Sequence, residues 1–408
     1  MRKPVLTIFY QFNPWHTSIG GIQTVIRSCI KYAPSDFVVR LVGTGQPDQK
    51  IGVWQEGEFA GRSLQFFPLI GIKDDNIRGL IPTTIKYTAA MLGRSFASDF
   101  MHFHRLEPSV AALNWSGEKT LFLHNDIEKQ MNPTVGENTI LWKHFPAGYF
   151  ALENLLIKQF AQIYSCNSES ANFYQKRYPE LAQRVTFLKN TVDNEIFYPL
   201  NPQEKEEKRK ALAQKLNLPQ TTRFLLFAGR LHPQKDPLLL VRTIAALQEP
   251  DVHLLIAGDG ELKGEVQSEV DKLGLTGRVT LLGSVIQEQL ADLHRLASIF
   301  MLTSVFEGLP LVVLEALSCG TPVVTTPAGE TPKLLTKDSG LVCEQRTPEA
   351  IAATLQEILR HPQAYPTSSC VRAAQPFSAR SVVTDVYATM LEHWQQNLPV
   401  STIPQYVK

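Results

Sequence analysis

Two glutamates, Glu307 and Glu315, lie on either side of a turn that the sequence predicts to open a helix. Gly308 permits an irregular backbone, and Pro310 suits a first helical turn, where its missing N–H is no loss. The run that follows is apolar except for Glu315. A helix start presents unpaired N–H groups and a positive dipole end, which attract phosphate. The segment is therefore suited to a nucleotide diphosphate joined to a sugar, with an acid at each end for hydroxyls. The alternative is a buried helix that happens to carry one glutamate.

Arg230 and Lys235 are a second candidate group. They come directly after a predicted strand, at the carboxyl edge where open α/β sheets bind ligands. Arginine offers a planar fork of donors, and lysine offers a compact point charge. Together they could hold a diphosphate leaving group as negative charge builds on it, which lowers the barrier electrostatically. The alternative is an exposed pair near a helix start.

Gly20 and Gly21 follow the first predicted strand and precede a helix with apolar periodicity. Two glycines let backbone N–H groups approach a ligand closely, although an ordinary strand-to-helix turn uses glycine too. His124 ends another predicted strand. It could donate a hydrogen bond to a sugar hydroxyl, whereas a buried histidine with satisfied nitrogens is the alternative.

Two further patterns resemble a metal site and a dinucleotide site, but neither is complete enough to predict a bound metal or cofactor. His102 and His104 share one face of a predicted strand, yet two histidines, even with Glu107 as a third ligand, make a poor metal site. Packing, or a role in lining an acceptor site, is favoured. The glycine turn Gly258-Asp259-Gly260 invites a dinucleotide interpretation, but the next strand region carries no acid for a ribose. We therefore expect no metal and no cofactor.

Short apolar runs alternate with longer amphipathic segments, which predicts α/β domains with parallel sheets. At 408 residues the chain suits two domains of ordinary size. We expect two Rossmann-like doubly wound domains, residues 1–195 and 196–376, with a final helix at 377–396 that completes the first. The predicted strands are 5–9, 38–42, 64–67, 100–103, 121–124, 163–166 and 185–188, then 224–228, 253–257, 279–282, 299–302, 323–325 and 340–342.

The balance of 40 Lys plus Arg against 39 Asp plus Glu provides no global field for nucleic acid or an anionic membrane. Five scattered cysteines without a C-x-x-C predict reduced, mostly buried thiols in a cytoplasmic protein. No run approaches the length of a spanning helix. The segment 72–96 is amphipathic and basic, so weak peripheral contact with a membrane is possible, although a helix packed on the sheet is favoured.

The segment from Glu307 to Glu315 resembles the E-x7-E motif of retaining glycosyltransferases of family four (glycosyl transferases group 1), which have the GT-B fold of two domains facing a cleft. The resemblance extends in the family's order over most of the chain. Its other motifs are Gly20-Gly21-Ile22-Gln23-Thr24-Val25, Leu123-His124-Asn125-Asp126, Asn190-Thr191-Val192-Asp193 with Phe197-Tyr198-Pro199, Phe227-Ala228-Gly229-Arg230-Leu231 with Lys235, and Ile256-Ala257-Gly258-Asp259-Gly260.

The resemblance implies roles for these residues in a metal-independent transfer of a sugar from a nucleotide sugar to a glycan or lipid-linked acceptor. Glu315 would hold the ribose, Glu307 and His124 the donor sugar, and Arg230 with Lys235 the departing diphosphate. Gly20 and Gly21 would approach phosphate or acceptor, and the remaining donor-site positions would be Gly229, Gly258, Gly260, Gly308, Leu309 and Leu311. No D-x-D metal motif of the other common glycosyltransferase fold occurs.

Three positions depart from the family pattern: Gln23 and Lys333 stand where glutamates are usual, and Ala379 where tryptophan is frequent. Lys333 leaves open a catalytically silent nucleotide-sugar-binding subunit. A GT-B epimerase or phosphorylase is the enzymatic rival, disfavoured because an epimerase would not be expected to keep the E-x7-E spacing and no cofactor lysine is identified. Bacterial envelope or polysaccharide synthesis is the expectation for the family as a whole.

Overall fold

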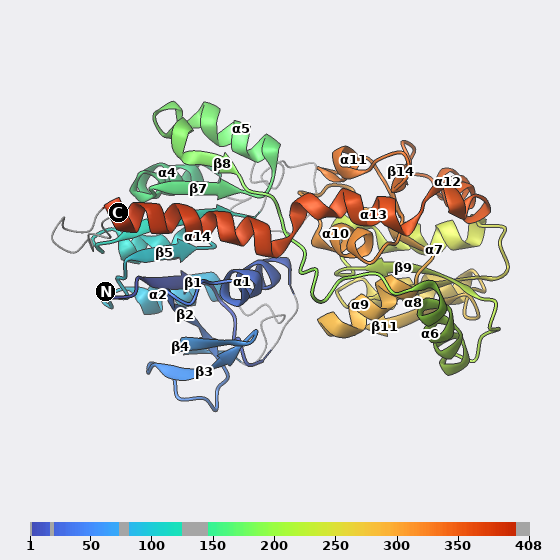
Figure 1. Ribbon diagram of the computed structural model, residues 1–408, viewed down its shortest axis with the longest axis horizontal. Helices are drawn as coiled ribbons and strands as arrows, with labels where there is room; N and C mark the ends of the chain where they lie inside the picture. Colours follow the sequence, from blue (N-terminus) through green and yellow to red (C-terminus); the bar gives the residue numbers. More distant parts are fainter. Residues whose placement is uncertain (1, 17–19, 73–80, 125–145, 397–408) are drawn as a thin grey trace, which may run out of the picture. The chain divides into compact units, whose positions relative to one another are not determined.

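A computed structural model describes residues 2–16, 20–72, 81–124 and 146–396 of the chain. The chain divides into two compact units (Figure 1). The first unit comprises residues 1–189 together with 379–408, and the second comprises residues 190–378. The change of unit at residue 189 precedes the predicted boundary at residue 195, because the Asn190–Asp193 motif lies wholly in the second unit.

The first unit contains an eight-stranded sheet in the order β3-β4-β2-β1-β5-β6-β7-β8. Every pairing in it is parallel except that of the edge strand β3 with β4. The strands are β1 (Val5–Phe9), β2 (Val38–Gly45), β3 (Gln55–Phe59), β4 (Arg62–Gly71), β5 (Phe100–Phe103), β6 (Glu118–Leu123), β7 (Gln162–Ser165) and β8 (Val185–Phe187). Its α-helices are α1 (Gly21–Lys31), α2 (Thr83–Met91), α4 (Pro146–Leu156), α5 (Ser168–Arg177) and α14 (Ala379–Gln396), with short 3-10 helices η1 (Glu107–Ala112), η3 (Ile157–Gln159) and η4 (Pro179–Arg184).

The second unit contains a six-stranded, all-parallel sheet in the order β11-β10-β9-β12-β13-β14. The strands are β9 (Arg223–Ala228), β10 (Val252–Ala257), β11 (Val279–Gly283), β12 (Ile299–Leu302), β13 (Val323–Thr325) and β14 (Gly340–Val342). The α-helices are α6 (Pro202–Lys215), α7 (Pro237–Ala246), α8 (Lys263–Lys272), α9 (Gln287–Leu296), α10 (Leu311–Ser318), α11 (Thr331–Leu334), α12 (Pro348–Arg360) and α13 (Thr367–Ala374), and the 3-10 helices are η5 (Pro233–Lys235), η6 (Pro362–Ala364) and η7 (Gln375–Phe377).

Numbered within this second sheet, the strand order is 3-2-1-4-5-6, the doubly wound order in which ligands bind where the winding reverses. The predicted class of two Rossmann-like α/β domains is therefore confirmed. All thirteen predicted strands occur, with ends that differ by a few residues. The prediction missed β3, whose sequence Gln-Glu-Gly-Glu-Phe is mostly polar because it lies at the edge of its sheet.

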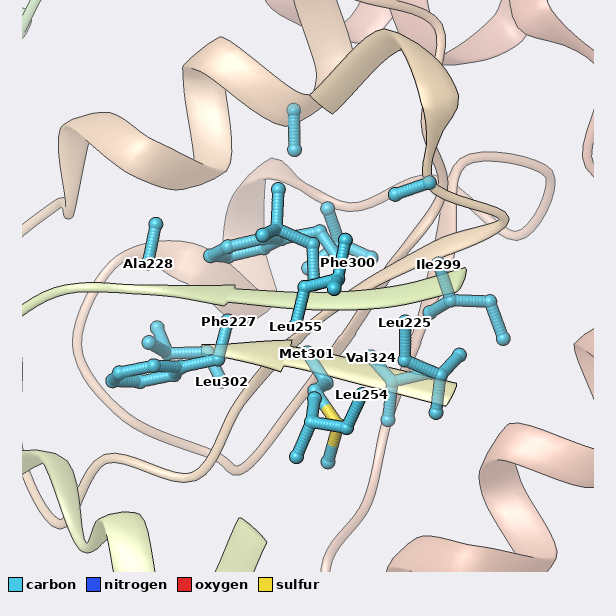
Figure 2. Packing of buried hydrophobic residues seen from close by; sticks show 14 of the residues in the cluster. Leu225, Phe227, Ala228, Leu254, Leu255, Ile299, Phe300, Met301, Leu302 and Val324 are labelled. Carbon is cyan, nitrogen blue, oxygen red and sulfur yellow. The ribbon is translucent and has the colours of Figure 1, made fainter. Parts of the chain in front are cut away.

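The core of the second unit is built on the central strands of its sheet (Figure 2). Successive residues of β9 point to opposite faces, and yet Phe224–Ala228 are all buried. This burial of both faces is the reason for the continuous apolar run that identified the strand, because helices cover both sides of a parallel sheet. The rigid layer fixes the loops at the carboxyl ends of its strands.

Helix α14 belongs to the first unit and lies beside β1 and β5 in Figure 1. Its buried apolar residues include Val382, Val383, Val386, Tyr387 and Met390. The Tyr387 hydroxyl donates a hydrogen bond to the Cys29 carbonyl at 3.1 Å. The contact is therefore made although Ala379 replaces the tryptophan expected from the resemblance.

The predicted amphipathic segment 72–96 contains a much shorter helix, α2, and residues 73–80 lie outside the described part of the chain. Tyr87 and Met91 are buried, whereas Ile81, Ile85 and Leu92 are exposed. The five cysteines are free thiols, and four of them are buried, as predicted. In the described residues no helix is long and apolar enough to cross a membrane.

Candidate active site

The strongest candidate site lies in the second unit at the point where the winding of its sheet reverses. Strands β9 and β12 are neighbours in the sheet, and β9 is followed by Arg230 and Lys235. Strand β12 is followed by the segment from Thr303 to Pro310. The topology thus brings together two groups that are about 70 residues apart in the chain, at the edge where α/β sheets bind ligands.

Backbone hydrogen bonds hold these two segments side by side. The Val305 N–H donates to the Gln234 carbonyl at 2.8 Å, and the Gln234 side chain donates to the Phe306 carbonyl at 3.0 Å. The Thr303 hydroxyl bonds with the carbonyls of Lys235 and Asp236 at 2.9 and 3.0 Å. These bonds fix Lys235 opposite the turn that carries the first glutamate of the motif.

An ion pair results, with Lys235 Nζ 2.5 Å from Glu307 Oε1. The side chains are 18% and 7% exposed, so water screens the charges only weakly. The Ser304 hydroxyl donates to the same oxygen at 2.5 Å. Neither bond uses Oε2 of Glu307. The pair therefore presents an ammonium group and a carboxylate oxygen, which suit a phosphate and a sugar hydroxyl respectively.

Helix α10 begins at Leu311, with Pro310 as its N-cap, directly after the turn that the sequence predicts to open a helix. No side chain caps this N-terminus. The main-chain N–H groups at Leu309 and Leu311 therefore belong to a helix start that keeps its attraction for anions. The loop before the helix is supported by Gly329, whose φ is +65° and where a Cβ would lie 2.2 Å from the carbonyl oxygens of both Glu307 and Gly308.

Glu315, on the same helix, is only 5% exposed. Its Oε2 has no hydrogen-bond partner within the described residues and lies 3.8 Å from His294 Nε2. Burial lowers the pKa of His294, and the Glu315 carboxylate only partly opposes this effect. A buried carboxylate oxygen without a donor costs free energy, which a ligand hydroxyl would recover. The geometry therefore agrees with a role for Glu315 in binding hydroxyls.

Arg230 lies beside Glu261, which directly follows the glycine turn after β10. Its guanidinium is 3.2 Å from Glu261, and both side chains are about half exposed, 55% and 45%. His232 Nε2 lies 3.3 Å from the other oxygen of Glu261. The sequence analysis missed Glu261, because its only signal is its place directly after Gly260. An incoming phosphate would compete with this weak ion pair for Arg230.

The remaining candidates lie in the first unit, where the winding of its sheet reverses between β1 and β5. Gly20 is the N-cap of α1, whose N-terminus no side chain caps, and Gly21 is its first residue. His124 directly follows β6 and is half-buried. The neighbouring Asn125 and Asp126 of the predicted motif lie outside the described residues.

Three histidines of this unit are packed together around Phe122. His104 Nδ1 lies 2.8 Å from His124 Nε2, and the two rings lie edge to edge and nearly coplanar, with centroids 5.0 Å apart and an interplanar angle of 13°. His102 is almost fully buried, and neither of its ring nitrogens has a hydrogen-bond partner within the described residues. Burial lowers the pKa of His102 and of His124 to about 3. All three rings are therefore neutral at physiological pH, since burial also lowers the pKa of His104.

This burial predicts that acid destabilises the first unit. Below pH 6.5 His102 binds a proton in the unfolded state, whereas in the folded state it stays neutral down to about pH 3. The free energy of unfolding therefore falls as the pH falls. The contribution of His102 should be about 2 kcal/mol between pH 7 and pH 5. Urea unfolding followed by tryptophan fluorescence measures it, because all five tryptophans belong to this unit. His102→Phe should have a shallower pH dependence than the wild type, and equal slopes would contradict this prediction.

No group of three or more His, Cys, Asp or Glu side chains that could hold a metal ion occurs in the described ranges. The expected independence of metal and cofactor stays a prediction. The ten candidate positions from Gly229 to Glu315 are gathered in the second unit, whereas Gly20, Gly21 and His124 belong to the first.

Comparison with known proteins identifies the second unit, in which ten of the candidate positions lie. Residues 208–373 match the family model "Glycosyl transferases group 1". The D-inositol 3-phosphate glycosyltransferase of Streptomyces coelicolor is 28% identical over 276 residues, 62% of this chain and 60% of that protein. Its namesake in Mycolicibacterium smegmatis is 33% identical over 199 residues, 47% and 44% of the two chains. The chain thus spans less than two thirds of the length of these curated relatives.

Solved structures resemble the chain over nearly all of its length. Sucrose-phosphate synthase from Thermosynechococcus elongatus superposes with a TM-score of 0.77 at 16% identity, covering 97% of this chain and 100% of its own. Anabaena HepE in complex with UDP-glucose gives a TM-score of 0.70 at 17% identity, with 95% and 100% covered. At these identities the likeness shows the fold alone, two α/β domains of the GT-B class.

Proposed function

From the match of residues 208–373 to the glycosyl transferases group 1 model and from the site in the second unit, we propose that the protein is a retaining glycosyltransferase. It moves a sugar from a nucleotide diphosphate sugar to a glycan or lipid-linked acceptor. Anabaena HepE is described in complexes with UDP, with UDP-glucose, and with UDP and glucose, which supports a nucleotide sugar as the donor class.

The observation that carries this proposal is the Lys235–Glu307 ion pair at the point where the second sheet reverses. The pair joins a cation for phosphate to a carboxylate for a hydroxyl, within 2.5 Å of one another and largely shielded from water. In a sugar joined to a diphosphate, an anionic phosphate and a sugar hydroxyl lie next to each other. Such a substrate therefore fits the pair better than free phosphate or a neutral sugar does.

We assign the residues around this pair according to what each can donate or accept. Lys235 and Arg230 stabilise the charge that builds on the departing diphosphate, together with the uncapped start of α10. Glu307 accepts a hydrogen bond from the donor sugar, and Glu315 accepts one from the ribose. As the resemblance to retaining glycosyltransferases implies, the proposed reaction passes through an oxocarbenium-like state with the leaving phosphate on the same face and retains the anomeric configuration.

In this proposal the first unit binds the acceptor, with Gly20 and Gly21 at the start of α1, and His124 orients the donor sugar. Synthesis of a polysaccharide or an envelope glycan in the cytoplasm is the pathway class we propose. Weak peripheral contact with a membrane stays a prediction. The exposed Ile81, Ile85 and Leu92 beside Lys86 are the residues that would make it, and co-sedimentation with anionic vesicles would test it.

The test is thermal stabilisation by a panel of UDP-, GDP-, ADP- and TDP-sugars without added metal. A ligand at about 100 times its Kd should stabilise the protein by roughly 2.7 kcal/mol. We expect one nucleotide class to raise the melting temperature of the wild type and to fail with Arg230→Ala and Glu315→Ala. Arg242→Ala is the matched control, because Arg242 forms an exposed ion pair with Glu269 and has no part in the proposed site.

The alternatives give different results in the same experiment. A catalytically silent subunit would bind the donor but would not hydrolyse it without acceptor or transfer the sugar. An epimerase would change the configuration of the sugar. Binding of no nucleotide sugar, or binding that both site variants keep, would overturn the assignment of the donor site.

A further inference from the structure

Among the described residues His104 makes the closest polar contact of His124, although its sequence position predicts no catalytic role. His104 Nδ1 and His124 Nε2 are 2.8 Å apart, which is a good hydrogen-bond distance. Both rings are neutral, because burial lowers the pKa of each. A single proton therefore lies between the two nitrogens, and it belongs to one ring or to the other.

The surroundings of His104 decide which ring carries this proton. His104 Nε2 is buried and has no hydrogen-bond partner within the described residues. If His124 donated the proton, His104 would carry its own proton on Nε2, as a buried donor without an acceptor. If His104 donates from Nδ1, its Nε2 keeps only an unused lone pair. Orphaned buried N–H groups are rarer than under-satisfied acceptors, so the second arrangement is favoured.

We propose that His104 is a positioning residue that fixes the tautomer and ring orientation of His124. By donating from Nδ1 to His124 Nε2, it leaves the proton of His124 on Nδ1. His124 then offers a neutral N–H donor, suited to a hydroxyl of a sugar. This inference rests on the proposed function for the identity of the ligand, but the hydrogen bond itself does not depend on that function.

Two further contacts hold His124 in one orientation. Its carbonyl accepts a hydrogen bond from the Cys166 thiol at 3.2 Å. The His104 ring stacks on Phe122, with centroids 4.6 Å apart and an interplanar angle of 9°. The His124 ring lies edge to edge with His104 and nearly in its plane, because the centroids are 5.0 Å apart, the bonded nitrogens are 2.8 Å apart, and the interplanar angle is 13°. Stacking on Phe122 holds the His104 ring, and the in-plane hydrogen bond sets the rotation of the His124 ring. Such a partner for a functional histidine is a familiar device for choosing which nitrogen is protonated.

The test uses three variants at the two buried histidines of the same strand end. His104→Phe keeps an aromatic ring in the stack and removes Nδ1. His104→Asn restores an N–H donor close to the position of Nδ1. His102→Phe is the matched control, because His102 is equally buried, also contacts Phe122, and has no hydrogen bond to His124.

Nitrogen-15 NMR of the imidazole rings reads the tautomer directly and needs no substrate. In the wild type we expect His124 to be protonated at Nδ1, and in His104→Phe to shift toward the Nε2–H form. His104→Phe should lower kcat/KM for the donor about tenfold, His104→Asn should recover most of it, and His102→Phe should stay near the wild type.

The outcomes separate the inference from the proposed function. Protonation of His124 at Nε2 in the wild type, or equal losses of activity in His104→Phe and His102→Phe, would overturn the role of His104. Absence of any sugar transfer by the wild type would count against the proposed function. The NMR result would still show whether His104 sets the tautomer of His124.

Discussion

Lys235→Met should abolish most of the activity and also destabilise the second unit. Removing the ammonium leaves Glu307, 7% exposed, with the Ser304 hydroxyl as its remaining side-chain donor among the described residues. Breaking a buried ion pair by removing one partner costs roughly 3–5 kcal/mol, and we expect the lower end because Lys235 is 18% exposed. The loss of a preorganised donor to the leaving phosphate should lower kcat by about 10²–10³-fold.

The effect on stability can be separated from the effect on catalysis with the double variant Lys235→Met/Glu307→Gln. Removing both charges should be less destabilising than the sum of the single substitutions, by about 0.5–3 kcal/mol. Activity should not recover in the double variant, because both ligand-binding groups are lost. Urea unfolding and initial rates at saturating donor measure the two effects.

Lys210→Met is the matched control for Lys235→Met. Lys210 lies 3.4 Å from Glu206 on α6, and both side chains are 48% exposed. An exposed ion pair contributes only about 0–1 kcal/mol, so this variant should keep its stability and its activity. If Lys235→Met behaved like Lys210→Met, the ion pair would have neither the structural nor the catalytic role assigned to it.

Much of the fold could be predicted from the sequence because both sheets are buried on both faces. Strands such as 224–228 and 299–302 are uninterrupted apolar runs, and the structure has strands there. Strand β3 has no such run, since only Phe59 of its five residues is buried. The prediction missed β3 because this edge strand faces water and contains few apolar residues.

The candidate site was predictable to the extent that its residues follow strands. Arg230, Lys235 and Glu307 each come after a strand of the second sheet, and the strand order brings them to one edge. The partners of these residues were not predictable. In the sequence Glu261 looks like any exposed polar residue, and only the fold places it beside Arg230.

Residue 333 shows the same limit. The sequence analysis singled out Lys333 because the resemblance implies a glutamate there. In the structure its side chain is 57% exposed and lies 3.3 Å from Glu330, which is 11% exposed. The Glu330 N–H donates to the Gly308 carbonyl at 2.9 Å, within the Glu307 turn. The ion pair thus connects Lys333 to this turn through Glu330.

Gly258→Ala should be the most destabilising single-methyl substitution near the site. Gly258 has φ +150°, which a residue with a side chain rarely adopts, and an added Cβ would lie 1.9 Å from the Gly229 carbonyl oxygen. That oxygen is main chain and cannot rotate away, so the strands β9 and β10 would have to move apart. Backbone strain and overpacking each cost about 1–3 kcal/mol, so we expect a loss of roughly 3 kcal/mol or more.

Gly264→Ala provides the control, since it adds the same methyl group six residues further along the chain. Gly264 lies in α8, and an added Cβ there would meet nothing within 4 Å. Alanine is the better helix former, so this variant should be unchanged or more stable by up to about 1 kcal/mol. Urea unfolding followed by far-UV circular dichroism detects the second unit, which contains none of the tryptophans.

The activity of Gly258→Ala distinguishes a local effect from a general one. Gly258 contacts the carbonyl of Gly229, and Gly229 directly precedes Arg230, so a shift of this turn moves the guanidinium assigned to the diphosphate. A displacement of about 1 Å can cost on the order of 10²-fold in rate, even in molecules that stay folded. We therefore expect kcat/KM per folded molecule to fall in Gly258→Ala and not in Gly264→Ala. Wild-type activity in folded Gly258→Ala would mean that the turn supports the sheet but does not position Arg230.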